Sequence, residues 1–168
     1  MYFSAPTIIL TAAHCVLDAR AFVVTAGAHR HADPEATQQI QVSTEAVLHE
    51  EWLRYLIEND LAYIRTVGPF TFNEYVQPIP LATLEPPPGE MVTAVGWGRN
   101  DDWNETISDV LNKVDVPVAD DLACNSFWGF FYDYDRIVCT DTTGIKTFCV
   151  VRKGSVAVMH LYEYAIVL

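Results

Sequence analysis

The chain has 168 residues, of which 51% are hydrophobic and 19% are charged, so it holds enough apolar volume for a packed core and is not a disordered polypeptide. Its 10 basic and 22 acidic residues give a net charge of −12, which argues against a nucleic-acid partner because such binding relies on Lys and Arg. No stretch reaches the roughly 18 uninterrupted apolar residues of a membrane-spanning helix, so the sequence predicts no membrane span.

Short apolar runs separated by turn residues recur along the chain, and several alternate between apolar and polar positions as half-buried strands do. This pattern is typical of antiparallel all-β domains, and helix is scarce. One short helix is predicted near 120–127, where Asp120 and Asp121 suit the N-terminal end of a helix. The predicted strands are 7–11, 21–25, 39–43, 61–65, 91–95, 111–116, 136–139 and a tail strand from Val156.

The proline-rich segment 78–88 is predicted to connect two β-rich halves, since proline offers no donor to a strand ladder. We expect one domain over 1–168 with two β subdomains, at about 1–80 and 90–144. After these the tail 145–168 loses its turn residues and becomes apolar. Two interpretations of the tail stay open: an additional strand that covers a sheet edge, or the product of a translated intron or a shifted reading frame.

A histidine and an aspartate form the first candidate site. His14 stands in Thr11-Ala-Ala-His-Cys15, and the two alanines allow a sharp, closely packed turn that would hold His14 at a strand end. Imidazole accepts and returns protons near neutral pH, which suits a general base, and a carboxylate is needed to fix its tautomer. Asp60 lies 46 positions downstream, just before the predicted strand 61–65, and is the candidate carboxylate.

Three segments, Thr11-Ala-Ala-His-Cys15, Asn59-Asp-Leu-Ala-Tyr-Ile64 and Val95-Gly-Trp-Gly98, resemble in this order the chymotrypsin-like (trypsin-like) serine peptidases. The resemblance runs from about 6 to 144, and Cys139-Thr-Asp-Thr-Thr-Gly144 resembles the insect and crustacean digestive members. It implies a chymotrypsin-like double β-barrel that is truncated at both ends, without the first strands and the C-terminal part of the second barrel.

The same resemblance implies that His14 is the catalytic base and Asp60 the carboxylate that orients it. Proteins or peptides would be the substrates, no cofactor would be needed, and the protein would be secreted. The start of the chain has no basic region and only a short apolar core, so it is not predicted to be a signal peptide.

The nucleophile of the family is the serine of a Cys-x-Gly-Asp-Ser-Gly-Gly-Pro segment, whose main-chain N–H groups form the oxyanion hole. This chain reads Cys149-Val-Val-Arg-Lys-Gly-Ser155 instead, which places Lys153 at the position of the serine. Ser155 comes two residues late, and near-attack geometry tolerates displacements of about an ångström. The sequence therefore predicts a base and a carboxylate without a nucleophile.

The four cysteines suit a secreted protein with disulfides. The resemblance implies a Cys124–Cys139 bridge and leaves Cys15 and Cys149 without their family partners. Asn104 begins an Asn-Glu-Thr sequon and is a glycosylation candidate if the protein enters the secretory pathway.

No metal site is predicted. His29 and His31 are two positions apart in a polar stretch, without a matching Cys/His cluster nearby. Asp33, Glu35 and Glu45 lie in the region where some relatives hold calcium, but they form no ligand pattern.

Three functional hypotheses follow, and they leave open whether this chain is an enzyme. The first is a serine endopeptidase by descent that is inactive as written. The second is a fragment or mis-spliced form of an active secreted digestive serine protease. The third is a non-catalytic homologue that acts as a binding module.

Overall fold

The computed structural model describes residues 6–55, 58–80, 82–98, 106–129, 137–141 and 157–160. The chain divides into two compact units, with the boundary between Ala82 and Thr83. Within the described ranges, no helix is long and apolar enough to cross a membrane. In chain order the elements are β1 (Ile8–Thr11), α1 (Ala13–Val16), β2 (Phe22–Ala26), β3 (Gln39–Ser43), β4 (Glu45–Leu48), β5 (Ala62–Arg65), β6 (Met91–Gly96), β7 (Asn112–Pro117), α2 (Asp121–Trp128), β8 (Ile137–Thr140) and β9 (Ala157–His160).

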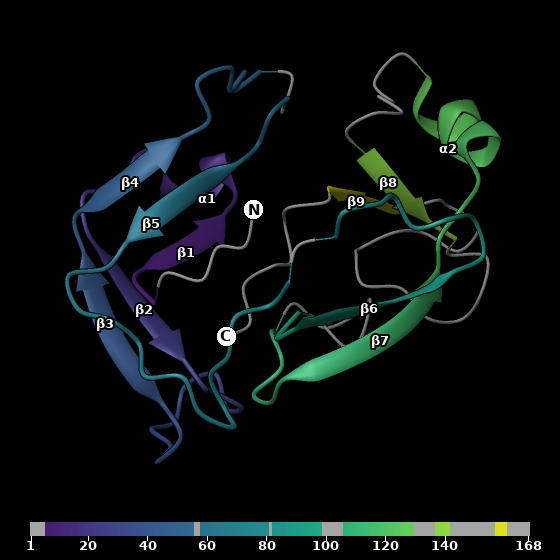
Figure 1. The fold of residues 1–168 in the computed structure, drawn as a ribbon. Helices are drawn as coiled ribbons and strands as arrows, with labels where there is room; N and C mark the ends of the chain where they lie inside the picture. The colour runs from purple at the N-terminus through teal and green to yellow at the C-terminus, as the bar shows by residue number, and fades with distance from the viewer. Residues whose placement is uncertain are drawn as a thin grey trace. The chain divides into compact units, whose positions relative to one another are not determined.

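The first unit contains an antiparallel sheet in the order β1-β5-β4 and an antiparallel pair of β2 with β3 (Figure 1). In the three-stranded sheet, Ile64 at the centre pairs with Ile9 on one side and with Ala46 on the other. Successive side chains point to opposite faces of a strand, so this row lies on one face of the sheet. Ile9 and Ile64 are buried there, and burial alternates along both β1 and β5.

Among the described residues, one hydrophobic cluster forms the core of the first unit. It joins β1, α1, the end of β2 and β5 to two residues of the following loop, and its buried members are Ile9, Ala13, Val16, Ala26, Ala62, Ile64, Phe70 and Val76. Gly27 follows β2 at φ +72°, and a β-carbon there would lie 2.4 Å from the carbonyl oxygen of Thr37. Only glycine therefore allows the chain to turn so close to its neighbour at this point.

The strand β4 is an element that the sequence pattern did not predict. Ser43 ends β3, and its buried hydroxyl donates to the Arg65 carbonyl oxygen (2.5 Å) and accepts from the N–H of Glu45 (2.9 Å). These bonds satisfy main-chain groups where the chain passes from β3, which pairs with β2, to β4, which pairs with β5. The chain thereby continues on to pair with β5, the strand that follows Asp60.

The second unit contains the antiparallel pairs β6–β7 and β8–β9. Ala94 on β6 and Val116 on β7 are buried, again at alternate positions. The strand β9, at Ala157–His160, falls within the predicted tail strand and pairs with β8. The helix α2 covers the region predicted at 120–127 to within a residue at each end.

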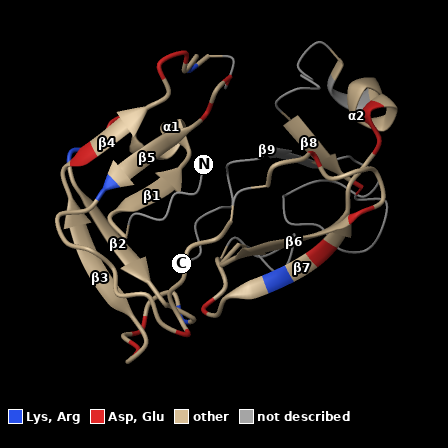
Figure 2. Cartoon of the chain, viewed as in Figure 1, with Lys and Arg blue, Asp and Glu red and all other residues tan. Residues whose placement is uncertain are grey.

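The charged residues of the described strands lie on exposed surfaces. Acidic residues outnumber basic ones, as Figure 2 shows. Glu45 on β4 accepts from Arg65 Nε on β5 at 3.1 Å, and both side chains are about half exposed. On β7, Lys113 and Asp115 are both exposed. Such ion pairs contribute little to stability, so the apolar clusters carry the packing of each unit.

Candidate active site

His14 is positioned by a short helix that begins directly after β1. Ala12 is extended (φ −78°, ψ 143°), and the chain then enters the single turn of α1. Ala12 and Ala13 are buried, so the main chain packs closely against the core with no larger side chain to hold it away. The sharp turn predicted at the strand end is thus one turn of helix, and it leaves the His14 side chain 51% exposed.

Strand register brings Asp60 to this turn. Thr11, the last residue of β1, pairs with Ala62, the first residue of β5. Because the two strands are antiparallel, the residues that follow β1 and those that precede β5 leave the sheet at the same edge. His14 and Asp60, 46 positions apart in sequence, therefore meet there.

Both oxygens of the Asp60 carboxylate accept hydrogen bonds from His14. Oδ1 accepts from the main-chain N–H at 2.8 Å, and Oδ2 lies 2.5 Å from Nδ1 of the imidazole. The Asp60 side chain is 1% exposed, so these donors satisfy a carboxylate that water barely reaches. A carboxylate is an acceptor, which places the ring proton on Nδ1 and leaves Nε2 as the basic nitrogen.

The nitrogen Nε2 has a thiol beside it. Cys15 Sγ lies 3.3 Å from Nε2 of His14, and Cys15 is exposed. The sequence motif contains Cys15, but the spacing alone gave no sign that its sulfur would contact the ring.

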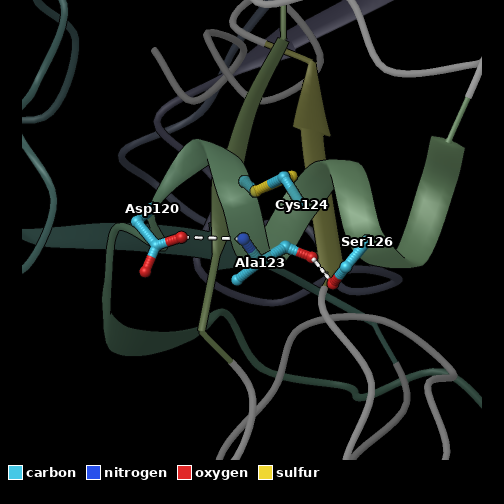
Figure 3. Close-up of a disulfide and its surroundings, with 5 residues drawn as sticks. Asp120, Ala123, Cys124 and Ser126 are labelled. Carbon is cyan, nitrogen blue, oxygen red and sulfur yellow. Dashed lines mark hydrogen bonds between the residues drawn. A yellow bond between two sulfur atoms is a disulfide. The ribbon is translucent and has the colours of Figure 1, made fainter.

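A disulfide joins the start of α2 to β8 in the second unit. It links Cys124 to Cys139, with the two Cα atoms 6.1 Å apart, and both residues are fully buried. As Figure 3 shows, Asp120 caps the helix by accepting from the Ala123 N–H at 2.7 Å, one turn before Ser126 Oγ donates back to the Ala123 carbonyl at 2.8 Å. Asp120 therefore caps the helix as its sequence position predicted. Such a cap contributes about 1 kcal/mol to helix stability.

Four other residues singled out from the sequence lie outside the described ranges. They are Asn104, Cys149, Lys153 and Ser155. The missing nucleophile and the glycosylation candidate therefore remain predictions.

The acidic residues near His29 and His31 bond to their own loop. Glu35 Oε2 accepts from the main-chain N–H of His29 (2.6 Å) and of Arg30 (2.8 Å), and Asp33 accepts from Arg30 Nε at 2.6 Å. Among the described residues, no group of three or more Cys, His, Asp or Glu is arranged to hold a metal ion.

We expect the pKa of Glu35 to lie below the ordinary value of a glutamate, because the N–H groups of Arg30 and then of His29 bond to its charged form. A lowered pKa in the folded loop means that its stabilising effect is present above the unfolded pKa and is lost as the pH falls through the folded pKa. Carboxyl NMR titration measures the pKa, and the His29 and Arg30 amide shifts should follow the same curve. In Glu35→Gln that curve should vanish, and its persistence would contradict this account.

Asn59 precedes Asp60 in the motif and has an unusual backbone conformation. Its φ is +55°, and it is the one non-glycine residue with a positive φ in the described part of the chain. Its side-chain Nδ2 donates to the Glu51 carbonyl oxygen at 2.9 Å. Sequence reasoning treated it only as part of the motif, although asparagine is among the residues that tolerate this region best.

Comparison with known proteins shows which family this chain belongs to. The family model described as "Trypsin" matches residues 3–150. Brachyurin of Leptuca pugilator is 39% identical over 155 residues, which cover 89% of this chain and 67% of that protein. Trypsin-1 of Astacus astacus is 30% identical (77% of this chain, 56% of that protein), and trypsin-1 of Salmo salar is 32% identical (70% and 48%). The chain thus spans two thirds of the length of the brachyurin and about half that of the trypsins.

A solved structure described as "Structure of GrC" superimposes with a TM-score of 0.78 at 26% identity, covering 94% of this chain and 69% of that one. Together with the β-rich architecture, this match confirms the predicted all-β, chymotrypsin-like fold. The sheets within the described ranges do not close into a barrel. The family match over residues 3–150 and the identity to a crustacean brachyurin show that this chain belongs to the trypsin family of chymotrypsin-like serine peptidases.

Proposed function

We propose that this chain is a serine endopeptidase by descent that retains the base and its carboxylate and lacks the nucleophile. His14 is the base, and Asp60 is the carboxylate that orients it. One observation supports these roles above all: the buried Asp60 carboxylate accepts from both the main-chain N–H and the ring Nδ1 of His14. This arrangement fixes the imidazole and keeps Nε2 as a proton acceptor.

The reaction of the lineage is peptide-bond hydrolysis through an acyl-enzyme, and its steps are those of the well-known Ser-His-Asp template. Nε2 takes the proton of a serine hydroxyl while that oxygen attacks the peptide carbonyl carbon. The imidazolium then donates this proton to the leaving amine. Throughout, Asp60 keeps its bond to Nδ1 and stabilises the positive charge on His14.

This chain lacks the hydroxyl that the base would activate. Lys153 stands where the serine belongs, and an ammonium group at neutral pH has no lone pair with which to attack a carbonyl. The segment 150–154 also replaces the glycine-rich turn whose N–H groups bind the developing oxyanion. Loss of one such donor alone slows a protease by roughly 10²–10³-fold. We therefore propose that the chain as written does not hydrolyse peptide bonds.

Proteins or peptides are the proposed ligands, and the extracellular space is the proposed location. The likeness to brachyurin and to two trypsins supports both. The Cys124–Cys139 disulfide adds a physical argument for the location, since disulfides persist in oxidising compartments.

A second candidate function is favoured by the completeness of the His14–Asp60 pair: an active digestive endopeptidase whose serine segment is encoded in another reading frame. Sequencing the transcript decides between the two candidates. A frame after codon 144 that encodes Gly-Asp-Ser-Gly-Gly would establish the second, and its absence would leave the first.

Hydrolysis assays test the first candidate directly. The purified chain is incubated with peptide substrates in parallel with His14→Ala. We expect both proteins to stay at the rate of the buffer blank. Cleavage by the unmodified chain that is lost in His14→Ala would refute the proposal.

A further inference from the structure

We infer that Asn59 is a positioning residue, whose left-handed backbone and side-chain amide aim the Asp60 carboxylate at His14. The inference rests on the proposed roles of His14 and Asp60 as base and carboxylate. It assigns the direction of the carboxylate to a residue whose side-chain amide bonds to the Glu51 carbonyl oxygen.

The backbone of Asn59 supplies the first part of the argument. At φ +55° the chain is in the left-handed region, which most side chains avoid because the β-carbon crowds the following carbonyl. Asparagine adopts it at low cost. A residue with a larger or branched side chain would relax toward negative φ and rotate the peptide plane that leads into Asp60.

A tight turn links the backbone conformation of Asn59 to the position of the Asp60 carboxylate. The N–H of Leu61 donates to the Asn59 carbonyl oxygen at 2.7 Å, which closes a three-residue turn centred on Asp60. The carbonyl of Leu61 accepts from the N–H of His49 at 2.8 Å, so the far side of the turn is tied to the chain that follows β4. Asp60 thus stands at the apex of a turn whose end at Leu61 is anchored.

The side chain of Asn59 anchors the other end. Nδ2 donates to the carbonyl oxygen of Glu51 at 2.9 Å, and the Leu53 N–H donates to the Glu58 carbonyl at 3.0 Å beside it. Asn59 is partly buried, and the Glu51 carbonyl that its amide binds lies at the surface. Both ends of the turn are therefore fixed to the same neighbouring segment, 49–53.

Such fixing matters because Asp60 must satisfy two donors at once. Its oxygens lie 2.8 Å from the His14 main-chain nitrogen and 2.5 Å from Nδ1. A rotation of the turn that preserves one bond lengthens the other, and the Nδ1 bond is the one that sets the tautomer of the ring. Asn59 acts on the imidazole only through this carboxylate.

The test is NMR spectroscopy of the ¹⁵N-labelled full chain, with the Nδ1 proton of His14 assigned by its loss in His14→Ala. Asn59→Leu removes the amide and disfavours the left-handed backbone. We expect its Nδ1 proton to exchange with water about tenfold faster than in the unmodified chain, and the ring nitrogens to show mixed tautomers. Asn59→Gly keeps the backbone and loses only the amide, so its exchange rate should fall between the two.

Asn73→Leu is the matched control. Asn73 lies in the same unit, and its side-chain oxygen accepts from the N–H groups of Tyr75 and Val76. This variant should keep the exchange rate of the unmodified chain. An unchanged rate in Asn59→Leu would overturn the inference, as would an equal acceleration in Asn73→Leu. If Asn59→Leu does not fold, an unchanged rate in Asn59→Gly would overturn it. Because the readout needs no hydrolysis, failure of the proposed function would appear separately in the activity assays.

Discussion

Replacing Cys124 and Cys139 together by alanine is expected to lower the free energy of unfolding by about 3 kcal/mol. The bridge closes a loop with a sequence separation of 15 residues, and in the chain-entropy model a loop of this size gives roughly that value. Both cysteines are buried together with Ala119, so alanine also leaves space in this cluster. Urea unfolding followed by circular dichroism measures the change.

Cys15→Ala serves as the control for this prediction. Cys15 is exposed and lies in the first unit, so its replacement should change the unfolding free energy by less than about 0.5 kcal/mol. A reducing agent should weaken the unmodified chain, by less than the double substitution because the sulfur atoms still fill their space, and leave the double variant unchanged. A double variant as stable as the unmodified chain would show that the bridge contributes nothing.

Asp60→Ala is expected to destabilise the first unit by about 3 kcal/mol. The change removes a buried carboxylate that accepts two hydrogen bonds from His14, and it leaves the main-chain N–H without its acceptor. Bonds to a charged group contribute roughly 1.5–3 kcal/mol each, and the unsatisfied donor adds to the loss. Native-state hydrogen exchange of the β5 amides isolates the first unit from the second and gives the free energy directly.

Glu45→Ala is the matched control for Asp60→Ala. It also removes a carboxylate from the first unit, but Glu45 pairs with Arg65 on the exposed face of the sheet. We expect a change below about 1 kcal/mol. Equal effects of the two substitutions would contradict the view that burial makes Asp60 a structural anchor as well as the partner of His14.

Much of the fold was predictable because its strands are short apolar or alternating runs bounded by turn residues. The segments that became β1 and β5 are short apolar runs, and the structure buries alternate residues of each, among them Ile9 and Ile64. The strand β4 was missed because it is only four residues long, Glu45–Leu48, and is flanked by polar and charged residues on both sides. Its strand conformation depends on Ser43 and on pairing with β5, which are tertiary interactions.

The candidate site also has one part that could be predicted from the sequence and one part that could not. Its place before a predicted strand made Asp60 a candidate carboxylate, and the family resemblance implied that it serves His14. The register of Thr11 with Ala62 explains the contact physically. The conformation of Asn59 was not predictable, since many residues that tolerate positive φ never adopt it. What selects it here is the pairing of 58–61 with 49–53, which no local pattern records.

The central claim is that the base and its carboxylate are present while the nucleophile is absent. Incubation of the purified chain with a fluorophosphonate, followed by intact-mass spectrometry, tests it most directly, because the reagent forms a covalent bond with an activated serine. The account predicts no adduct on the unmodified chain and none on His14→Ala. One adduct per chain that disappears in His14→Ala would contradict it, since it would reveal a hydroxyl that His14 activates.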